Sequence, residues 1–135
     1  MRSRTTSRRA AIVFALLLSA CAHVSVQRAV VSDRLFCGLS ISDGSMITDA
    51  QLETFIDEIV VPRFPDGFSV RRGEGYYLDK VKGPTAEPSI TIEIVHADTI
   101  AASRAVREIA EEYRRRFRQQ AVLRVRSPAQ IEVIE

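Results

Sequence analysis

Residues 89–117 decide the fold, and they read SITIEIVHADTIAASRAVREIAEEYRRRF. In the first half every second residue is apolar, which predicts a strand with one buried face. In the second half apolar residues recur every three or four positions, which predicts an amphipathic helix capped by Asp98 or Thr99. The core-facing residues predicted for this strand and helix are Ile90, Ile92, Ile94, Ala102, Val106, Ile109, Tyr113 and Phe117.

Upstream of this stretch a second strand and helix are predicted. Residues 34–41 alternate apolar and polar, with Leu35 and Cys37 on the core face. Residues 48–51 form a capping-box pattern, Thr-Asp-Ala-Gln, and open a helix that Pro62 brings to an end.

The remaining strands are marked less clearly. A strand is expected from Phe68, and the glycine pair Gly73 and Gly75 predicts a bulge or a close backbone approach in it. Residues 82–88 are expected to form a loop.

The last predicted strand covers residues 122–126, with Leu123 and Val125 facing inward. Residues 131–134 are candidates for a short edge strand. The resulting order is β-α-β-β-α-β, so we expect an α+β ferredoxin-like sandwich: an antiparallel sheet of order 4-1-3-2 with two helices on one face.

The N-terminus has the pattern of a secretory signal peptide. The first nine residues hold four arginines and no acid, and residues 10–18 are an uncharged apolar run. The run is too short to span a bilayer. It ends in Leu18-Ser19-Ala20-Cys21, which resembles the lipobox of bacterial lipoproteins.

We therefore expect residues 1–20 to be a signal peptide, Cys21 to be lipidated, residues 21–32 to be a tether and residues 33–135 to be a single domain. The expected location is the periplasmic face of the outer membrane, with the lipid bilayer as a partner through Cys21. The general secretory route is favoured, and residues 7–9, Ser-Arg-Arg, leave the twin-arginine route open.

Composition limits the function classes. The full chain has a formal net charge of +2, but four of its 19 basic residues precede Cys21, leaving 15 against 17 acidic residues. The exported chain is therefore slightly acidic, and nucleic acid is not an expected partner. With Cys21 lipidated, Cys37 is left without a disulfide partner and is expected in the core.

The sheet face opposite the helices is the first candidate surface. We expect four side chains to project from it: Arg34, Phe36, Glu93 and Arg124. Because the face mixes apolar and charged residues, a homodimer interface or the floor of a ligand-binding site is favoured over a face that contacts only solvent.

A second candidate surface involves Arg63, Asp66 and Tyr76. Arg63 and Asp66 are expected to form a local ion pair across a turn. The alternative is an anion-binding pocket formed by Arg63 and Tyr76.

His96 near Asp98 is interpreted as a strand-end residue rather than a metal ligand or base, because no second set of metal ligands has the required spacing. No catalytic residue, metal site or cofactor is expected.

The densest run of like charge is a group of arginines near the end of the predicted helix, at positions 114–116 and 118. Glu111 and Glu112 precede Arg115 and Arg116 by four residues, the favourable order for helical ion pairs. A solvated helix face is the leading interpretation, and contact with anionic lipid or another acidic partner is the alternative.

Several stretches resemble domain-of-unknown-function family 3574, a bacterial family often found behind lipoprotein signals. They are residues 34–39 (RLFCGL), 43–45 (DGS), 62–67 (PRFPDG), the glycines at 73 and 75, and 116–125 (RFRQQAVLRV). The chain departs from the family at Tyr76-Tyr77, where Gln-Trp is common, and at Gln120-Ala121, where Glu-Ser is common. The resemblance implies no assigned activity.

The leading functional hypothesis is thus a membrane-tethered, non-enzymatic periplasmic binding or interaction module, with a protein or small molecule as ligand. The alternative is a small periplasmic enzyme with a site near Arg63, Tyr76 and His96.

Overall fold

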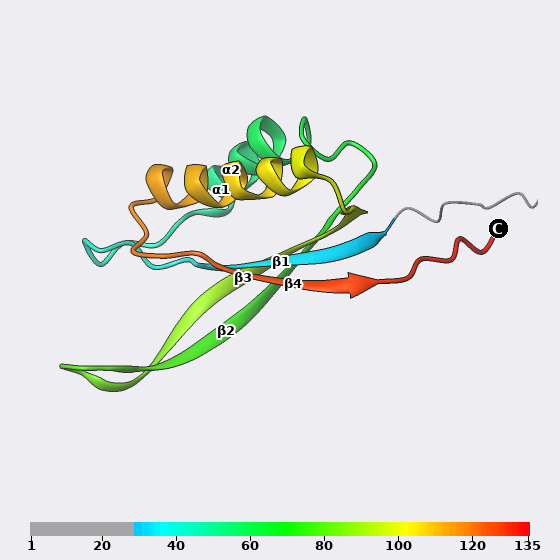
Figure 1. Cartoon of the computed structure of the whole chain (residues 1–135). Helices are drawn as coiled ribbons and strands as arrows, with labels where there is room; N and C mark the ends of the chain where they lie inside the picture. Colours follow the sequence, from blue (N-terminus) through cyan, green and yellow to red (C-terminus); the bar gives the residue numbers. More distant parts are fainter. Residues whose placement is uncertain (1–28) are drawn as a thin grey trace, which may run out of the picture.

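The computed structural model describes residues 29–135, so the expected signal peptide, Cys21 and most of the expected tether lie outside the described residues. The elements are β1 (Val30–Gly38), α1 (Asp49–Phe55), the π-helical turn η1 (Ile56–Val60), β2 (Ser69–Asp79), β3 (Gly83–Ala97), α2 (Ile100–Arg116) and β4 (Leu123–Ala129). The four strands form one antiparallel sheet of order β2-β3-β1-β4, and both helices cover one face (Figure 1). The predicted ferredoxin-like sandwich is confirmed.

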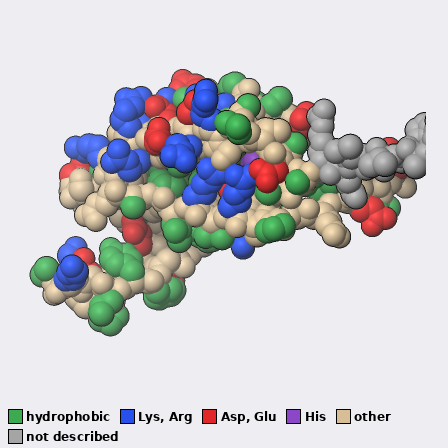
Figure 2. Space-filling view, in the orientation of Figure 1, with side chains coloured by type: hydrophobic (Ala, Val, Ile, Leu, Met, Phe, Trp, Pro, Cys, Tyr) green, Lys and Arg blue, Asp and Glu red, His purple; other side chains and the backbone are tan. Residues whose placement is uncertain are grey.

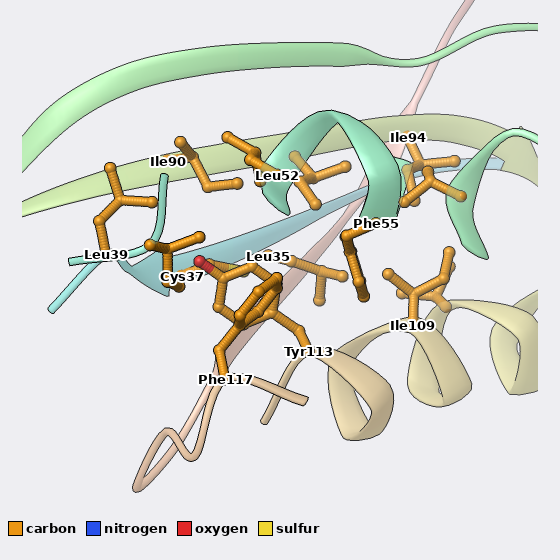
Figure 3. Close-up of a cluster of buried hydrophobic side chains, with 14 of the residues drawn as sticks. Leu35, Cys37, Leu39, Leu52, Phe55, Ile90, Ile94, Ile109, Tyr113 and Phe117 are labelled. Carbon is orange, nitrogen blue, oxygen red and sulfur yellow. The ribbon is translucent and has the colours of Figure 1, made fainter. Parts of the chain in front are cut away.

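The core lies between the helices and the two central strands. Leu35 of β1 is opposite Ile92 of β3, and both side chains are fully buried. Three aromatic rings, those of Phe55, Tyr113 and Phe117, pack against one another beneath α1 and α2, with centroids 4.8–5.7 Å apart (Figure 3). Each fully buried apolar side chain contributes about 1.5–3 kcal/mol, so this cluster supplies much of the driving force for folding.

Both helices begin where the sequence predicts. The hydroxyl of Thr48 accepts from the Gln51 backbone N–H at 3.2 Å, and the Gln51 side chain accepts from the Thr48 N–H at 2.9 Å, which completes the capping box. The hydroxyl of Thr99 accepts from the Ala102 N–H at 3.1 Å and caps α2. No helix among residues 29–135 is both long enough and apolar enough to cross a membrane.

Strands β2 and β3 run further than predicted. The expected bulge at Gly73 and Gly75 is absent, because the β2–β3 ladder is unbroken from Ser69 opposite Glu93 to Asp79 opposite Gly83. The expected loop at 82–88 is also wrong, since residues 83–88 belong to β3. Beyond the end of β1 the two strands continue as a two-stranded arm (Figure 1), defined here as residues 74–88.

The arm explains the prolines that predicted a loop. The Leu39 N–H donates to the Pro88 carbonyl at 2.9 Å, so Pro88 faces the β1 side of β3, just where β1 pairing ends. Pro84 lies four residues earlier and faces the same side of β3, at a level that β1 no longer reaches. A proline lacks an N–H and is tolerated on such an open edge.

Strand β4 has the opposite orientation to the prediction. Leu123 is 62% exposed on the open face of the sheet, and Arg124 points toward the helices. The buried carboxylate of Asp33 on β1 needs a cation on that side, and Arg124 supplies it. The edge strand expected at residues 131–134 is not formed, whereas β1 begins at Val30, inside the expected tether.

Candidate functional site

A buried ionic cluster lies where β1, β3, β4 and α2 meet. Asp33 is fully buried, and Arg124 binds it through two hydrogen bonds, from Nε to Oδ1 at 2.8 Å and from Nη2 to Oδ2 at 2.7 Å. His96 Nε2 lies 2.9 Å from Asp33 Oδ2, and its Nδ1 lies 2.8 Å from the Ala97 carbonyl. The carboxylate therefore has partners on both oxygens, the condition for keeping a charge in a protein interior.

The environment of Asp33 keeps it ionised. Burial by itself raises the pKa of Asp33, but the hydrogen bonds from Arg124 and His96 and the charges of Arg124 and Arg126 outweigh it, so the net pKa lies below the ordinary value.

Arg124 also joins the sheet to α2. Its Nη1 donates to the Ser103 carbonyl at 3.2 Å, and its Nη2 donates to the Ser103 hydroxyl at 3.1 Å. The same hydroxyl accepts from Arg126, which forms an ion pair with Asp98. Arg124 therefore uses most of its five N–H donors within the protein and is held in one orientation.

A surface groove runs between α2 and β4 beside this cluster, and Arg124 belongs to both. Its first hollow, of about 450 Å³, is lined by Arg107, Ala110, Glu111, Arg114, Gln120, Ala121, Val122 and Arg124. Its second hollow, of about 410 Å³, is lined by Thr99, Ile100, Ser103, Arg104, Arg107 and Arg126. Arg107 lines both, so we treat the two hollows as one groove. Figure 2 shows basic side chains gathered over this face of the molecule.

Three groove arginines form no ion pair with any residue of 29–135: Arg104, Arg107 and Arg114. Among residues 29–135, Glu111 is the only carboxylate that lines the hollows. Since guanidinium groups match phosphate and carboxylate through paired hydrogen bonds, this groove is suited chemically to an anion.

Arg115 and Arg116, also on α2, form ion pairs with neighbouring carboxylates at the surface, as the solvated-face interpretation predicts. Arg115 pairs with Glu112 at 2.7 Å, and Arg116 pairs with Glu112 at 3.3 Å and with Glu58 at 2.8 Å. The predicted pair of Glu112 with Arg116 is confirmed, whereas Arg115 pairs with Glu112 instead of the predicted Glu111. Arg114 differs from these neighbours because it faces the groove.

Some, but not all, of the residues predicted for the open face of the sheet lie on it. Phe36 is 38% exposed on that face, and Glu93 lies there in an ion pair with Arg71 at 2.8 Å. Arg34 is opposite Glu93 in the ladder, and its Nε is buried without a partner within the described chain. Arg124 was wrongly placed on this face.

The second predicted cluster does not assemble as one pocket. Arg63 forms its ion pair with Glu108, at 3.4 Å, rather than with Asp66. Tyr76 is 76% exposed on the arm, opposite Ala86, which precedes His96 by ten residues in the same strand. At about 3.3 Å per residue this places Tyr76 roughly 33 Å from His96. Phe64, the neighbour of Arg63, packs against His96 with ring centroids 5.5 Å apart.

Sequence reasoning missed Asp33 and the groove residues Arg104, Arg107 and Arg126. It had singled out Arg114 within the arginine run and Arg124 on the wrong face of the sheet. An acid in an alternating apolar strand was the signal for Asp33, since Val31, Asp33 and Leu35 share one face. Cys37 was predicted correctly as a core residue, and burial raises its pKa to about 12. Among residues 29–135 no group of three side chains could hold a metal ion.

Comparisons with solved structures agree with the fold. A phage SAM lyase in complex with S-methyl-5'-thioadenosine aligns with a TM-score of 0.59 at 21% identity, covering 73% of this chain and 81% of that chain. A phage SAM lyase in the apo state aligns with a TM-score of 0.59 at 20% identity, covering 76% of this chain and 83% of that chain. At these identities the likeness concerns the fold alone.

No curated protein matches the chain significantly. The family model described as "Protein of unknown function (DUF3574)" matches residues 32–133, which is nearly all of the described domain. That match confirms the resemblance carried by the sequence motifs, and the chain belongs to the DUF3574 family.

Proposed function

We propose that this protein is a lipoprotein, anchored by Cys21 to the periplasmic face of the outer membrane, and that it acts there as a non-enzymatic module binding an anionic ligand. The observation that supports the ligand class is the groove between α2 and β4, which is lined by three arginines without ion-pair partners in residues 29–135.

Electrostatics favours an occupied groove. Arg104 and Arg107 are three residues apart on α2, so their like charges repel each other. Arg124 and Arg126 add two more guanidinium groups, each already compensated by a carboxylate. A bound anion would relieve the repulsion, and each hydrogen bond to a charged group contributes about 1.5–3 kcal/mol.

The proposed anchor places this groove near a membrane. Val30 follows Cys21 by nine residues, a stretch that reaches about 30 Å when fully extended. The domain would therefore act close to lipid headgroups, cell-wall material or solutes at the membrane surface.

The second candidate function is catalysis, and the fold likeness to a phage SAM lyase solved with S-methyl-5'-thioadenosine favours testing it. The specific expectation is that S-methyl-5'-thioadenosine binds this domain. Conversion of S-adenosylmethionine by the purified domain would favour this function over simple binding.

The test uses residues 22–135, because the core cluster lies entirely between residues 35 and 117. Isothermal titration with pyrophosphate should show binding that Arg107→Gln weakens at least about tenfold, the loss of one charged hydrogen bond. The matched control is Arg115→Gln on the same helix, whose side chain pairs with Glu112 outside the groove, and it should leave the affinity unchanged. Equal losses in both variants would contradict the proposal.

A further inference from the structure

We infer that the groove takes a linear chain of phosphate groups, free or esterified, that spans both hollows. This deepens the proposed function and rests on it. The inference comes from how the arginines are spaced along α2 and from their approach to the groove from two sides.

The spacing on α2 sets the length of the ligand. Arg104, Arg107 and Arg114 are three and seven residues apart, so all three project within about 80° of one another around the helix. At 1.5 Å per residue, Arg107 and Arg114 are separated by about 10 Å along the axis, and Arg104 and Arg114 by about 15 Å. One small anion cannot contact both Arg104 and Arg114.

The two hollows offer different surroundings to the two ends of such a chain. The second hollow adds the hydroxyl-bearing residues Ser103 and Thr99 to Arg104 and Arg126. The first hollow places Arg114 beside apolar Ala121 and Val122. Arg107 belongs to both hollows and would contact the middle of the chain.

Phosphate fits this arrangement better than carboxylate. In each hollow guanidinium groups come from α2 and from β4, on two sides of the groove. A planar carboxylate is matched by one arginine fork, whereas a phosphate group carries tetrahedral acceptor oxygens that can accept from more than one α2 arginine. On the other side of the groove Arg124 and Arg126, which already bind Asp33, Asp98 and Ser103, act mainly through their charge. All five cationic residues of the groove are arginine, the residue suited to this paired geometry.

Glu111 makes the chain requirement stronger. It is the one carboxylate of the described chain that lines the groove, and it lies between Arg107 and Arg114 on the helix. Its charge opposes a single anion in the first hollow, and a longer chain offsets this by engaging the second hollow as well.

The experiment measures affinity against chain length by isothermal titration, with orthophosphate, pyrophosphate and linear polyphosphate of about ten units. We expect polyphosphate to bind at least about tenfold more tightly per chain than pyrophosphate, because additional charged hydrogen bonds form. Arg104→Gln and Arg114→Gln should each weaken polyphosphate binding about tenfold. For pyrophosphate, which is too short to reach both ends, only one of the two changes should matter.

Matched controls separate this inference from general charge effects. Arg115→Gln removes the same charge from the same helix outside the groove and should change neither affinity. Glu111→Gln should strengthen pyrophosphate binding more than polyphosphate binding. Polyglutamate of similar length tests whether phosphate is required, and vesicles containing phosphatidylglycerol test whether headgroup phosphates are the source.

The outcomes are distinct. Equal affinities for pyrophosphate and polyphosphate, with no dependence on Arg104, would overturn the chain inference and leave the anion-binding function standing. Equal binding of polyglutamate would overturn the phosphate class. Vesicle binding that requires both Arg104 and Arg114 would overturn the chain requirement, because phosphatidylglycerol carries one phosphate and separate headgroups would then occupy the two hollows. Absence of binding to every anion would reject the inference and the proposed function together.

Discussion

At the scale of single residues, the feature that most constrains this protein is the buried carboxylate of Asp33. It is fully enclosed and is held by Arg124 and His96. Removing one member of a buried ion pair strands the other charge, which costs about 3–5 kcal/mol. The cluster therefore holds β1, β3, β4 and α2 in one arrangement and fixes the side of the groove that Arg124 forms.

Asp33→Asn is predicted to lower the free energy of unfolding by about 3–5 kcal/mol, because Arg124 is left without its carboxylate. Urea denaturation of residues 22–135 measures this loss. Asp66→Asn on the exposed turn is the control and should stay within about 0.5 kcal/mol of the native chain. A loss for Asp33→Asn no greater than that of the control would contradict a stabilising role for the cluster.

The same residue predicts an acid dependence. The pKa of Asp33 is lower in the folded chain than its unfolded value, near 3.9. Its contribution to stability is therefore fully present above about pH 4 and is lost as the pH falls through the folded value. Urea denaturation between pH 2 and 6 should show a steeper acid decline in the native chain than in Asp33→Asn. Parallel pH curves for the two chains would show that Asp33 does not titrate with folding.

At the scale of secondary-structure elements, the arm formed by β2 and β3 is separate from the core. No residue between 69 and 89 belongs to the buried cluster, and Tyr76, Leu78 and Val81 are largely exposed. A two-stranded hairpin alone is only marginally stable in water. The arm is therefore ordered by the rest of the sheet and contributes little to it.

Shortening the arm tests this independence. Replacing residues 76–86 by Asn-Gly joins Gly75 to its cross-strand partner Glu87 through a two-residue turn. We expect the free energy of unfolding to change by less than about 1 kcal/mol, because no buried apolar area is removed. Thermal and urea unfolding measure it. Loss of cooperative folding in the shortened chain would show that the arm is part of the folding unit.

Strands and helices with one strongly buried face, such as β3 and α2, were predictable from the sequence. Elements at the edge of the sheet, such as β4, were not. The isoleucines of β3 and the stripe of α2 follow periods of two and 3.6, because a single core covers both. In β4 either face could be the inner one by pattern alone, and the partner of Arg124, namely Asp33, is 91 residues away in sequence. Arg104 and Arg107 look like solvated helix positions until β4 is placed beside α2. The groove is thus a tertiary feature without a local sequence signal.

At the scale of the whole molecule, the two ends of the sheet differ. The start of β1 and the end of β4 lie at the same end, and the arm extends from the other (Figure 1). The 15 residues of β3 run between these ends, a span of about 50 Å at 3.3 Å per residue. A chain anchored through residues preceding β1 would hold the β1 start toward the membrane and the arm away from it.

This arrangement depends on the proposed anchor at Cys21, which gives the last prediction. Acyl chains contribute about 0.8 kcal/mol per buried methylene, so a diacylated or triacylated protein stays on the membrane. In a bacterium expressing the full chain, Cys21→Ser should move the protein from the membrane fraction to the soluble periplasmic fraction and abolish palmitate labelling. Cys37→Ser is the matched control: its thiol is buried in the core, so both membrane location and labelling should be kept. Continued membrane association of Cys21→Ser would show that something other than the lipid holds the domain there, and the groove arginines would then be the first residues to substitute.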